Sequence, residues 1–483
     1  MRMDRVLQDV ALVGALGDLS APEVRSIAYD NRAVEPGALF CCVAGHTHDG
    51  HAFAAQAVAA GAVGVVAERP VEVGAPQALV APGQVRSAMA AASCRLWGDP
   101  SRTLTTIGVT GTNGKTSVTY LAAAALEAGG RPTVVIGTLS GARTTPEAPD
   151  LQRQLASAVG SGYQAAAVEV SSHALVQSRV QGTWFAVGVF TNLAHEHLDY
   201  HGSMEAYFEA KASLFEVEHC AAAVVNGDDP WGRILVERLA AARVPTATFS
   251  LADARDLVVG DGRTRFTWRG RRVELGVPGA FQVPNALAAA TTAAVIGVAE
   301  DDIVAGLGGA GPIPGRFEIV AAPPASPATV VVDFAHTTDA LVAVLTSARR
   351  VAGAGRVLCV FGCGGDRDRD KRPRMGAAAA DNADVVVITS DNPRGEDPGA
   401  IIRDIRSGIA TGAVAAVEVV PDRRAAIERA VSLARPGDVV VVAGKGHETT
   451  IEREGRVAPF DDRAVAAEVA RAATAEVRRG PRP

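Results

Sequence analysis

The stretch GVTGTNGKTSVTYLAAAAL, in which an apolar strand leads through a glycine-rich turn into an alanine-rich helix, constrains the fold of this chain most strongly. A turn in that position exposes backbone N–H groups at a helix N-terminus, where the helix dipole also favours a phosphate. Gly111 and Gly114 allow the backbone to approach closely, and Lys115 can reach the outer phosphates, while Thr116 can ligate Mg²⁺. The usual pattern has a glycine five residues before Gly114, where this chain has Val109, so we predict a variant of the nucleotide-binding loop.

The alternation of strand-like and helical segments continues along the chain. The strand-like segments that follow are PTVVIGT, AAAVEVSS, FAVGVFTNL, AAAVVNGDD, ATVVVDFA, RVLCVFGCGGD, ADVVVITSDNPR and DVVVVAGKGHE. Such alternation predicts α/β domains whose mainly parallel sheets carry helices on both faces. Ligands bind these sheets beyond the carboxyl ends of the strands, where several of the segments above end in polar residues.

The length of 483 residues suggests roughly three domains. Residues 1–101 contain ALFCCVA, an alanine-rich helical run and AVGVVAE, and they predict a small N-terminal α/β domain. Residues 102–315 predict a central domain of the phosphate-loop ATPase type, and residues 316–483 predict a Rossmann-like C-terminal domain. The segment IPGRFEIV, which contains Gly315, is predicted to be the hinge between the second and third domains.

The composition narrows the possible partners and the location. A formal charge of −6 argues against binding of nucleic acid through a basic surface. The N-terminus lacks the apolar core of a signal peptide, and no run of about 18 apolar residues predicts a membrane span. The six cysteines form no C-x-x-C pair, which is typical of reduced, mostly buried thiols. These features favour a cytoplasmic location, and we expect a monomer that acts on small molecules.

The loop phrase GVTGTNGKTS resembles the ATP-binding loop of the Mur ligase family. The resemblance extends, in the family's order, through TTPEAPDLQ, EVSSHALVQSRV, FTNLAHEHLDYHGSMEAYFEAKASLF, IPGRFE, VDFAHTTDAL, GCGGDRDRDKRPRMG, SDNPRGEDP and GKGHE. It implies a three-domain ATP-dependent amide ligase of the tripeptide-synthetase type, which adds meso-diaminopimelate to UDP-MurNAc-L-Ala-D-Glu in peptidoglycan synthesis. In that reaction a carboxylate takes the γ-phosphate of ATP to form an acyl phosphate, and the incoming amine then displaces phosphate.

The resemblance also implies which residues bind ATP and its metal ion. The matching nucleotide contacts are Gly111, Thr112, Asn113, Gly114, Lys115, Thr116, Ser117, Asn285, Arg316, Asp333 and His336. The implied Mg²⁺ ligands are Thr116, Glu169, His197 and a carbamate on Lys211, and the implied catalytic residues are Lys115, Glu169, His197 and Lys211. Without the resemblance, a solvated acid at a strand end is the favoured interpretation of Glu169. Lys211 could then be a phosphate-binding or helix-surface lysine. A carbamate would replace the positive charge of Lys211 by a negative one, and only an unprotonated lysine forms it.

For the UDP-sugar peptide, the resemblance implies contacts from the first two domains. The matching residues are Asn31, His46, Thr144, Thr145, Ser171, Gln177 and Arg179. This chain departs from the family pattern because Asn31 replaces a serine, Glu196 replaces an aspartate, and the loop GTLSGAR is short. We expect a more open pocket at that loop and altered geometry beside Glu196.

For the incoming amino acid, the implied contacts are Arg367, Asp391, Asn392, Pro393, Arg394, Gly444 and Glu448. Arg367 and Arg394 each follow a predicted strand, so both should face one crevice, although a solvated loop charge is the usual fate of an arginine. A guanidinium forms a strong, directional pair with a carboxylate. Diaminopimelate has a distal carboxylate that lysine lacks, and the resemblance associates the DNPR phrase with diaminopimelate.

Three alternatives remain open at this point. The departures at Asn31, Glu196 and the short loop leave room for a related ligase of another pathway, which would join a different amino acid to a different carboxylate. Folylpolyglutamate synthase has a similar phosphate-binding loop, but the segments GHTHDGH and DNPR argue against this identification. A catalytically silent ATP-binding regulator is disfavoured because Lys115, Glu169, His197 and Lys211 are all present.

Overall fold

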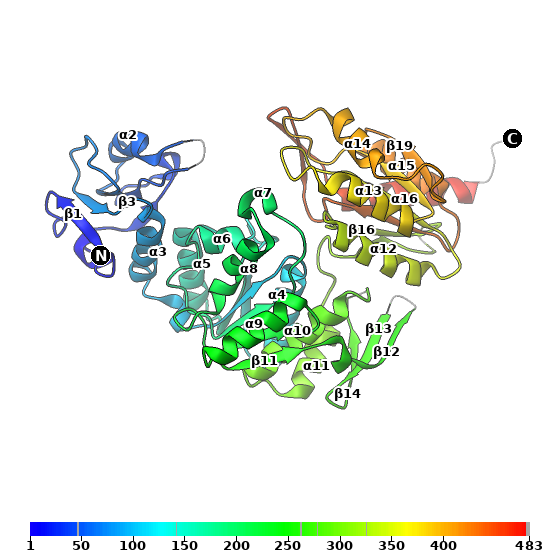
Figure 1. The fold of residues 1–483 in the computed structure, drawn as a ribbon, viewed down its shortest axis with the longest axis horizontal. Coiled ribbons are helices and arrows are strands. Elements are labelled where there is room, and N and C mark those ends of the chain that lie inside the picture. The colour runs from blue at the N-terminus through cyan, green and yellow to red at the C-terminus, as the bar shows by residue number, and fades with distance from the viewer. Residues whose placement is uncertain (46–47, 142, 261–262, 278, 325, 480–483) are drawn as a thin grey trace.

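The computed structural model describes residues 1–45, 48–141, 143–260, 263–277, 279–324 and 326–479. These residues form one five-stranded and two six-stranded sheets, each with its own helices. The three bodies lie one after another, with the two termini at opposite ends of the molecule (Figure 1). The predicted α/β class with mainly parallel sheets is confirmed. Within the described ranges, no helix combines the length and apolarity needed to cross a membrane.

The first sheet has the strand order β1-β5-β4-β3-β2, and its edge strand β1 pairs antiparallel with β5. Its strands are β1 (Leu12–Leu16), β2 (Ser26–Ala28), β3 (Ala38–Cys41), β4 (Gly64–Ala67) and β5 (Gln77–Val80). Helices α1 (Met3–Val6) and α3 (Val85–Leu96) pack on one face, and α2 (Ala54–Ala59) packs on the other. The sequence pattern predicts β3, α2 and β4 but misses the other strands, because short strands show little alternation.

The central sheet is entirely parallel, in the order β11-β10-β9-β6-β8-β7. Its strands are β6 (Thr105–Thr110), β7 (Thr133–Ile136), β8 (Ala165–Glu169), β9 (Val187–Phe190), β10 (Ala223–Asn226) and β11 (Thr246–Phe249). The accompanying helices are α4 (Lys115–Ala128), α5 (Ala148–Gly160), α6 (Ser172–Val176), α7 (Leu198–His201), α8 (Met204–Ala212), α9 (Pro230–Ala241), α10 (Gln282–Val295) and α11 (Glu300–Gly309). The glycine-rich turn lies between β6 and α4, as the sequence predicts.

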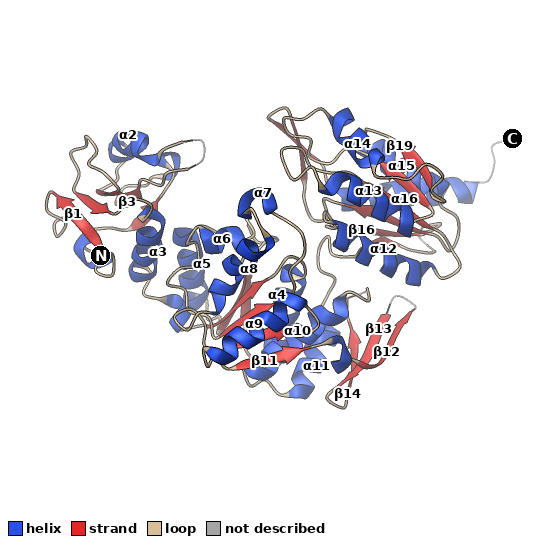
Figure 2. Ribbon diagram, in the orientation of Figure 1, coloured by secondary structure: helices blue, strands red, loops and turns tan. Residues whose placement is uncertain are grey.

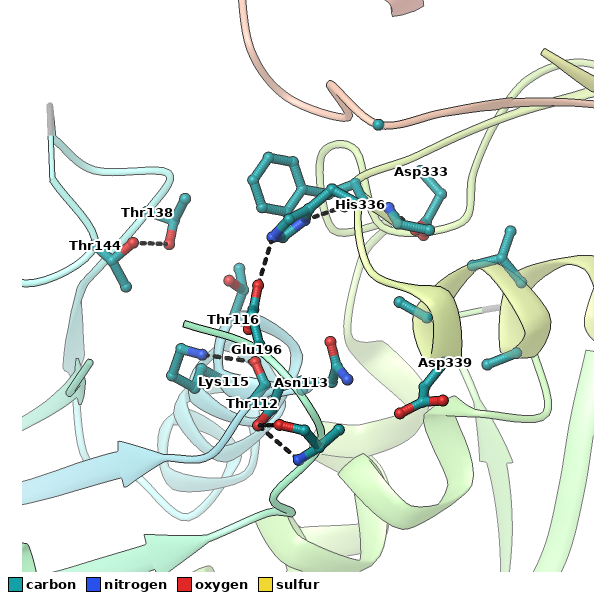
Figure 3. A pocket seen from close by; sticks show the side chains of 18 of the residues that line it. Thr112, Asn113, Lys115, Thr116, Thr138, Thr144, Glu196, Asp333, His336 and Asp339 are labelled. Atoms are coloured by element: carbon teal, nitrogen blue, oxygen red, sulfur yellow. Dashed lines mark hydrogen bonds and ion pairs between the residues drawn. The ribbon is translucent and has the colours of Figure 1, made fainter. Parts of the chain in front are cut away.

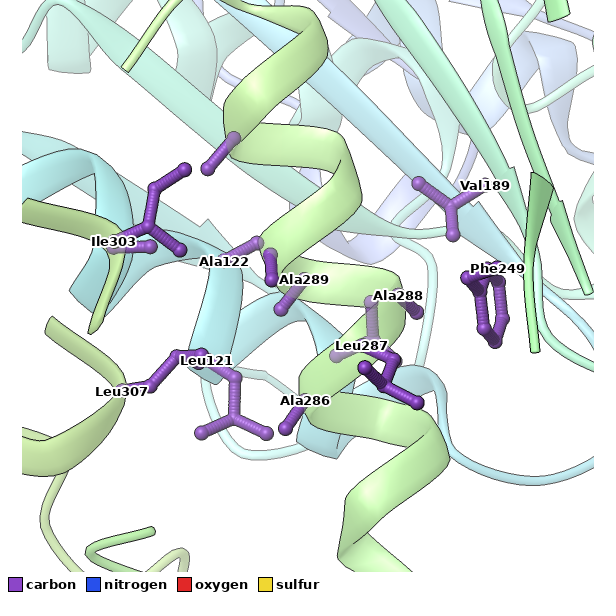
Figure 4. Packing of buried hydrophobic residues seen from close by; sticks show 14 of the residues in the cluster. Leu121, Ala122, Val189, Phe249, Ala286, Leu287, Ala288, Ala289, Ile303 and Leu307 are labelled. Atoms are coloured by element: carbon purple, nitrogen blue, oxygen red, sulfur yellow. The ribbon is translucent and has the colours of Figure 1, made fainter. Parts of the chain in front are cut away.

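Aliphatic and alanine side chains fill the core that α4, α10 and α11 form on one face of this sheet. Figure 4 shows Leu121 and Ala122 of α4 on the side of Leu307 and Ile303 of α11, with Leu287 of α10 farther along toward Phe249. Each fully buried side chain of this size contributes roughly 1.5–3 kcal/mol relative to an exposed one. Helices α5, α8 and α9 contribute to a second core on the opposite face, so the expected covering of both faces is present.

A small antiparallel sheet, which the sequence pattern does not reveal, follows β11. It consists of β12 (Arg255–Gly260), β13 (Arg263–Trp268) and β14 (Arg271–Leu275), and Figure 2 shows it as a separate group of strands. Phe266, Trp268 and Val273 bury their side chains against the central core. The segment RTRFTWRGRRVEL contains many charged residues, so its composition does not reveal the alternating apolar positions.

The third sheet has the order β15-β16-β20-β17-β18-β19, and only its edge strand β15 is antiparallel. Its strands are β15 (Glu318–Ala321), β16 (Thr329–Asp333), β17 (Val357–Phe361), β18 (Val385–Ile388), β19 (Ala416–Val419) and β20 (Val439–Ala443). Its helices are α12 (Thr338–Ala352), α13 (Lys371–Asn382), α14 (Pro398–Ser407), α15 (Arg423–Leu433) and α16 (Asp462–Arg479). A hairpin of β21 (Thr450–Arg453) and β22 (Arg456–Pro459) lies apart from the sheet. The valine runs in β16, β18 and β20 are buried because helices cover both faces.

The chain passes from the central core to the C-terminal core over a very short segment. Ile313 packs in the central core and Phe317 in the C-terminal core, so the crossing occupies residues 314–316. Gly315 has a φ of +67°, and a Cβ at this position would overlap the backbone at Gly446 and His447. A glycine is therefore required where this segment contacts the loop after β20.

Candidate active site

A single cleft brings together the phosphate loop, the ends of β8 and β9 and the loops of the third sheet. Its cavity volume is about 800 Å³, and Figure 3 shows side chains that line it. Two contacts cross it: His336 Nε2 lies 3.1 Å from Glu196 Oε1, and Arg316 Nη2 donates to Thr116 Oγ1 at 2.9 Å. The sequence-predicted residues that line the cleft are Thr112, Asn113, Gly114, Lys115, Thr116, Ser117, Thr144, Glu169, Ser171, His197, Asn285, Arg316, Asp333, His336, Arg367, Asp391, Asn392, Arg394, Gly444 and Glu448.

Two glycines give the loop its shape. Gly111 has a φ of +148°, and a Cβ there would overlap the Thr191 hydroxyl. Gly114 caps α4 with a φ of +88°, and a Cβ there would overlap the side-chain oxygen of Asn285. Asn285 thus lies directly against the loop, although it belongs to the distant helix α10. The loop leaves the first backbone N–H groups of α4 free to bind an anion.

Lys115 folds back over the loop that carries it. Its Nζ donates to the carbonyl oxygen of Gly111 at 2.8 Å and to that of Thr112 at 2.9 Å. Burial lowers the pKa of Lys115, while the neighbouring Glu196 and Glu169 act in the opposite direction. A phosphate in the loop would offer this ammonium stronger, charged acceptors than these two carbonyls.

Glu169 lies at the end of β8 and is 1% exposed. Its Oε2 accepts hydrogen bonds from Thr116 Oγ1 at 2.9 Å and Thr138 Oγ1 at 3.0 Å, and its Oε1 accepts one from the Thr138 backbone N–H at 2.9 Å. A carboxylate and a hydroxyl therefore meet at the first turn of α4. Both supply the oxygen ligands that Mg²⁺ prefers.

Lys211 lies behind the loop, buried to 1% exposure on α8. Its Nζ donates to the carbonyl oxygen of Gly111 at 2.9 Å, so Lys211 and Lys115 share one acceptor. The Nζ also lies 4.6 Å from the centre of the Tyr207 ring. Burial and the nearby charge of Lys115 hold the pKa of Lys211 well below its usual value. These surroundings favour a neutral amine, the form that reacts with CO₂.

His197 caps the short helix α7 in a left-handed conformation with a φ of 57°. Burial lowers its pKa to about 4, so the imidazole is neutral and can act as a metal ligand. Its neighbour Glu196 turns toward His336, as Figure 3 shows. Burial opposes ionisation of Glu196, but the hydrogen bond and charge of His336 outweigh it, and the pKa falls below its usual value. Glu196, whose side chain is longer than the aspartate of the family pattern, thus links the central and C-terminal bodies.

Arg316 and Asp333 lie where the third body begins. The Arg316 guanidinium lies 4.6 Å from the centre of the Phe334 ring, and within the described residues its buried Nε has no hydrogen-bond partner. Asp333 accepts the backbone N–H groups of Phe317 at 2.6 Å and Ala335 at 2.7 Å. Burial raises the pKa of Asp333 to about 6, although Arg316 partly opposes this. Asp333 therefore supports the polypeptide beside the cleft with both carboxylate oxygens.

Four residues assigned to the UDP-sugar peptide form a connected network beside the cleft. Thr145 Oγ1 donates to the Glu169 carbonyl at 2.7 Å and accepts the Ser171 backbone N–H at 3.0 Å. Arg179 donates to the Thr145 carbonyl at 3.0 Å and to Gln177 Oε1 at 2.7 Å. The network ties the loop before α5 to the end of β8.

Thr144 lines the cleft beside this network, within hydrogen-bonding distance of Thr138 (Figure 3). Nearby, the buried carboxylate of Glu147 pairs with Arg86, Arg143 and Arg179, and Arg86 comes from α3 of the first body. The ion pair of Arg86 with Glu147 therefore joins the first body to the central one.

Of the two residues assigned to the first body, Asn31 lies outside the cleft lining. The Asn31 amide donates to Gln56 Oε1 at 2.8 Å, within the first body itself. His46 lies outside the described residues.

The loops after β17, β18 and β20 form the other wall of the cleft. The Asn392 amide donates to Glu448 Oε2 at 2.8 Å, and the fully buried Lys445 donates to the same oxygen at 2.8 Å. Arg394 Nη1 donates to the Gly365 carbonyl at 2.7 Å. Arg367 and Arg394 both line the cleft, because β17 and β18 are neighbours in the sheet.

Of the remaining predicted contacts, Asp391 and Gly444 are adjacent, since a Cβ at Gly444 would approach Asp391 Oδ2 to 2.7 Å. Pro393 is buried and is absent from the lining of the cleft. Pro393 therefore shapes the turn between Asn392 and Arg394.

Several cleft residues were not singled out from the sequence, and three of them bond to predicted site residues. Thr138 bonds Glu169, Asn192 Oδ1 accepts the Asn113 backbone N–H at 2.9 Å, and Lys371 donates to the His336 carbonyl at 2.9 Å. Asn192 lies at the end of the predicted strand FAVGVFTNL, and this position could have identified it as a cleft residue. Thr138 likewise ends the predicted strand PTVVIGT, whereas Lys371 carries no comparable local signal.

All six cysteines are buried and free, as expected for reduced thiols. Within the described ranges, no group of three His, Cys, Asp or Glu side chains could hold a metal ion by itself. Any cation at this site would need the Thr116 hydroxyl, a modified lysine, water or substrate phosphate as further ligands, which is the usual manner of Mg²⁺ binding.

Three family models match successive parts of the chain: the Mur ligase family catalytic domain over residues 23–94, the Mur ligase middle domain over 109–293, and the Mur ligase glutamate ligase domain over 315–446. The chain belongs to the Mur ligase family. It is 41% identical over 470 residues to the UDP-N-acetylmuramoyl-L-alanyl-D-glutamate--2,6-diaminopimelate ligase of Syntrophomonas wolfei, with 93% of this chain and 95% of that protein covered.

Two solved structures show how widely this architecture recurs. A UDP-N-acetylmuramoyl-L-alanyl-D-glutamate--2,6-diaminopimelate ligase is 32% identical, with a TM-score of 0.66 and 99% of both chains covered. Folylpolyglutamate synthase of Mycobacterium tuberculosis, complexed with ADP and AMPPCP, is 21% identical, with a TM-score of 0.60, 83% of this chain and 96% of that chain covered. At that identity the second likeness concerns the fold alone.

Proposed function

We propose that this protein is an ATP-dependent amide ligase that joins meso-diaminopimelate to UDP-MurNAc-L-Ala-D-Glu through an acyl phosphate, in peptidoglycan synthesis. The observation that carries the proposal is the single cleft, which a phosphate loop, a buried acid and two arginine-bearing loops line together. The diaminopimelate ligase of Syntrophomonas wolfei, 41% identical over nearly the whole chain, supports the choice of substrates. We further propose domains at 1–101, 102–315 and 316–483 and a cytoplasmic monomer.

In this proposal the loop and its neighbours bind ATP. The backbone N–H groups at the start of α4, from Gly114 to Ser117, hold the phosphates, while those of Thr112 and Asn113 donate to Asn192 and fix the loop. Lys115 turns from the Gly111 and Thr112 carbonyls to the transferring phosphate. Asn285 contacts the adenine, and Arg316 and His336 reach the nucleotide from the third domain. The unpartnered Nε of Arg316 among the described residues is a donor that a nucleotide could satisfy.

Thr116, Glu169, His197 and a carbamate on Lys211 are proposed to hold Mg²⁺. The hydroxyl and carboxylate already meet at 2.9 Å, His197 lines the same cleft, and Lys211 Nζ reaches the Gly111 carbonyl at 2.9 Å behind the loop. The oxygen donors of Thr116 and Glu169 suit a hard cation. When bound, Mg²⁺ would neutralise phosphate charge during transfer. We assign Asn31, His46, Thr144, Thr145, Ser171, Gln177 and Arg179 to the UDP-sugar peptide.

The amino-acid pocket is assigned to the loops after β17, β18 and β20. Arg367 and Arg394 are proposed to pair the distal carboxylate of diaminopimelate, while Glu448 receives its distal amine. Asp391, Asn392, Pro393 and Gly444 shape the pocket around them. Phosphate release from ATP, measured with UDP-MurNAc-L-Ala-D-Glu and a panel of amino acids, tests the whole assignment.

Replacing Arg394 by alanine is expected to raise the KM for meso-diaminopimelate at least about tenfold and to leave the KM for ATP nearly unchanged. The substitution leaves the distal carboxylate of the bound substrate without this partner, which costs about 1.4 kcal/mol or more. Arg453→Ala is the matched control, since that arginine is 65% exposed on the neighbouring hairpin. Efficient use of L-lysine by the unchanged enzyme would contradict the carboxylate pairing and would favour a ligase of another pathway.

The C-terminal domain is expected to close on the central domain when ATP and the UDP-dipeptide are both bound. The crossing between their cores spans only residues 314–316, and the proposed amino-acid and nucleotide contacts lie on opposite sides of it. Small-angle scattering should show compaction with an ATP analogue plus UDP-dipeptide, relative to each ligand alone. An unchanged radius of gyration would count against a closing hinge.

A further inference from the structure

A buried arginine lies behind the two loops that carry Arg367 and Arg394, and the reaction proposed above makes no use of it. Arg372 is in the first turn of α13, and its side chain is 1% exposed. Burial of a guanidinium is unfavourable unless partners and hydrogen bonds compensate for the lost water. The groups that Arg372 contacts therefore indicate which segments its side chain holds together.

Arg372 makes a two-point contact with the carboxylate of Glu396, the second residue after the DNPR turn. Its Nη1 donates to Oε2 at 3.0 Å and its Nη2 donates to Oε1 at 2.8 Å. The same Oε1 accepts the backbone N–H of Asp366 at 2.6 Å, directly before Arg367. One carboxylate thus joins α13, the loop after β17 and the loop after β18.

The two loops also pair with each other directly. The backbone N–H of Gly365 donates to the Asn392 carbonyl at 2.9 Å, and Arg394 Nη1 donates back to the Gly365 carbonyl at 2.7 Å. The backbone N–H of Gly395 donates to Asp366 Oδ2 at 2.9 Å. Arg394 itself has a φ of 51°, a backbone conformation that its surroundings must maintain.

Two guanidinium groups on one wall of a cleft repel each other when no anion lies between them. Holding both loops at a set separation therefore requires a rigid joint beneath them. The contact of Arg372 with Glu396 supplies this joint, and Asp404 Oδ2 of α14 anchors Arg372 from the other side at 2.9 Å.

We propose that Arg372 and Glu396 are positioning residues that set the separation between Arg367 and Arg394, and with it the preference for an amino acid that carries a second carboxylate. The inference rests on the proposed function and deepens it. Neither residue needs to touch a substrate, because the effect passes through the Asp366 backbone and the DNPR turn.

Glu396→Gln is the variant of choice, because it keeps the shape of the side chain and removes its charge. We expect the KM for meso-diaminopimelate to rise at least about tenfold, and the preference over L-lysine to fall, with the KM for ATP within about twofold of the unchanged enzyme. Arg372→Lys is the second variant, since it keeps the charge but loses the two-point contact. Arg372→Lys should likewise raise the KM for meso-diaminopimelate and leave the KM for ATP nearly unchanged.

Two controls separate positioning from general stability. Glu418→Gln breaks another two-point pair of the same domain, in which Arg429 donates to both carboxylate oxygens at 2.8 Å outside the cleft. Asp438→Asn disrupts the pair between this largely buried carboxylate and Arg356, which lies in the same domain outside the cleft. Both controls should keep the KM for diaminopimelate close to its original value, whatever they do to the unfolding temperature.

The outcomes are distinguishable. An unchanged enzyme that turns over diaminopimelate, together with a Glu396→Gln variant whose KM is unaffected, overturns the inference and leaves the proposed function standing. Equal rises in KM for Glu396→Gln and the two controls also overturn it, because they indicate a loss of stability alone. An unchanged enzyme that does not use diaminopimelate overturns the proposed function and the inference with it.

Discussion

Replacing Lys211 by alanine is expected to abolish amide-bond formation almost completely. This lysine is 1% exposed, and it shares the Gly111 carbonyl with Lys115 at distances of 2.9 and 2.8 Å. Burial and the second ammonium hold the pKa of Lys211 well below its usual value, which favours the neutral amine that reacts with CO₂. Alanine would remove the proposed carbamate oxygens together with the charge that they bring to the Mg²⁺ site.

Short carboxylic acids, such as acetate, should restore part of the activity of Lys211→Ala, because they can place a carboxylate in the space of the carbamate. The matched control is Lys115→Ala, which the same acids should not restore. Full activity of enzyme prepared without CO₂, together with a free lysine in crystals, would contradict the proposal. A mass measurement in solution is insufficient, since carbamates are labile.

Replacing Lys115 by alanine is expected to lower turnover by about two to three orders of magnitude, the effect of removing one group aimed at developing charge. Its ammonium now bonds the Gly111 and Thr112 carbonyls, at the point where the loop would hold phosphates. The measurement is phosphate release from ATP at saturating UDP-dipeptide and amino acid, with and without a chelator of Mg²⁺.

Lys115→Met is the matched variant, since it keeps the apolar stem and loses only the charge. Both substitutions should leave the KM for diaminopimelate close to its original value, because the amino-acid loops belong to the third sheet. Normal turnover of Lys115→Ala, or turnover without any divalent cation, would contradict the assignment of the ATP site.

Local patterns along the chain determined much of this molecule. Valine-rich runs followed by turns and alanine-rich helices predicted the parallel sheets, since side-chain periodicity and turn chemistry depend on neighbouring residues. The loop from Gly111 to Thr116 was predicted for the same reason. The short strands of the first sheet and the charged sheet β12–β14 were missed, because only their packing against the central core and the first helices reveals which residues face inward.

Tertiary structure alone decided which residues meet across long separations of sequence. Asn285 lies against Gly114, Glu196 bonds His336, and Lys211 shares a carbonyl with Lys115. Nothing in the spacing of these residues encodes the contacts, because each depends on how separately formed helices and strands pack. The burial that lowers the pKa of Lys211, and the joint between Arg372 and Glu396, arise from that packing, since both require other elements to exclude water from the side chain.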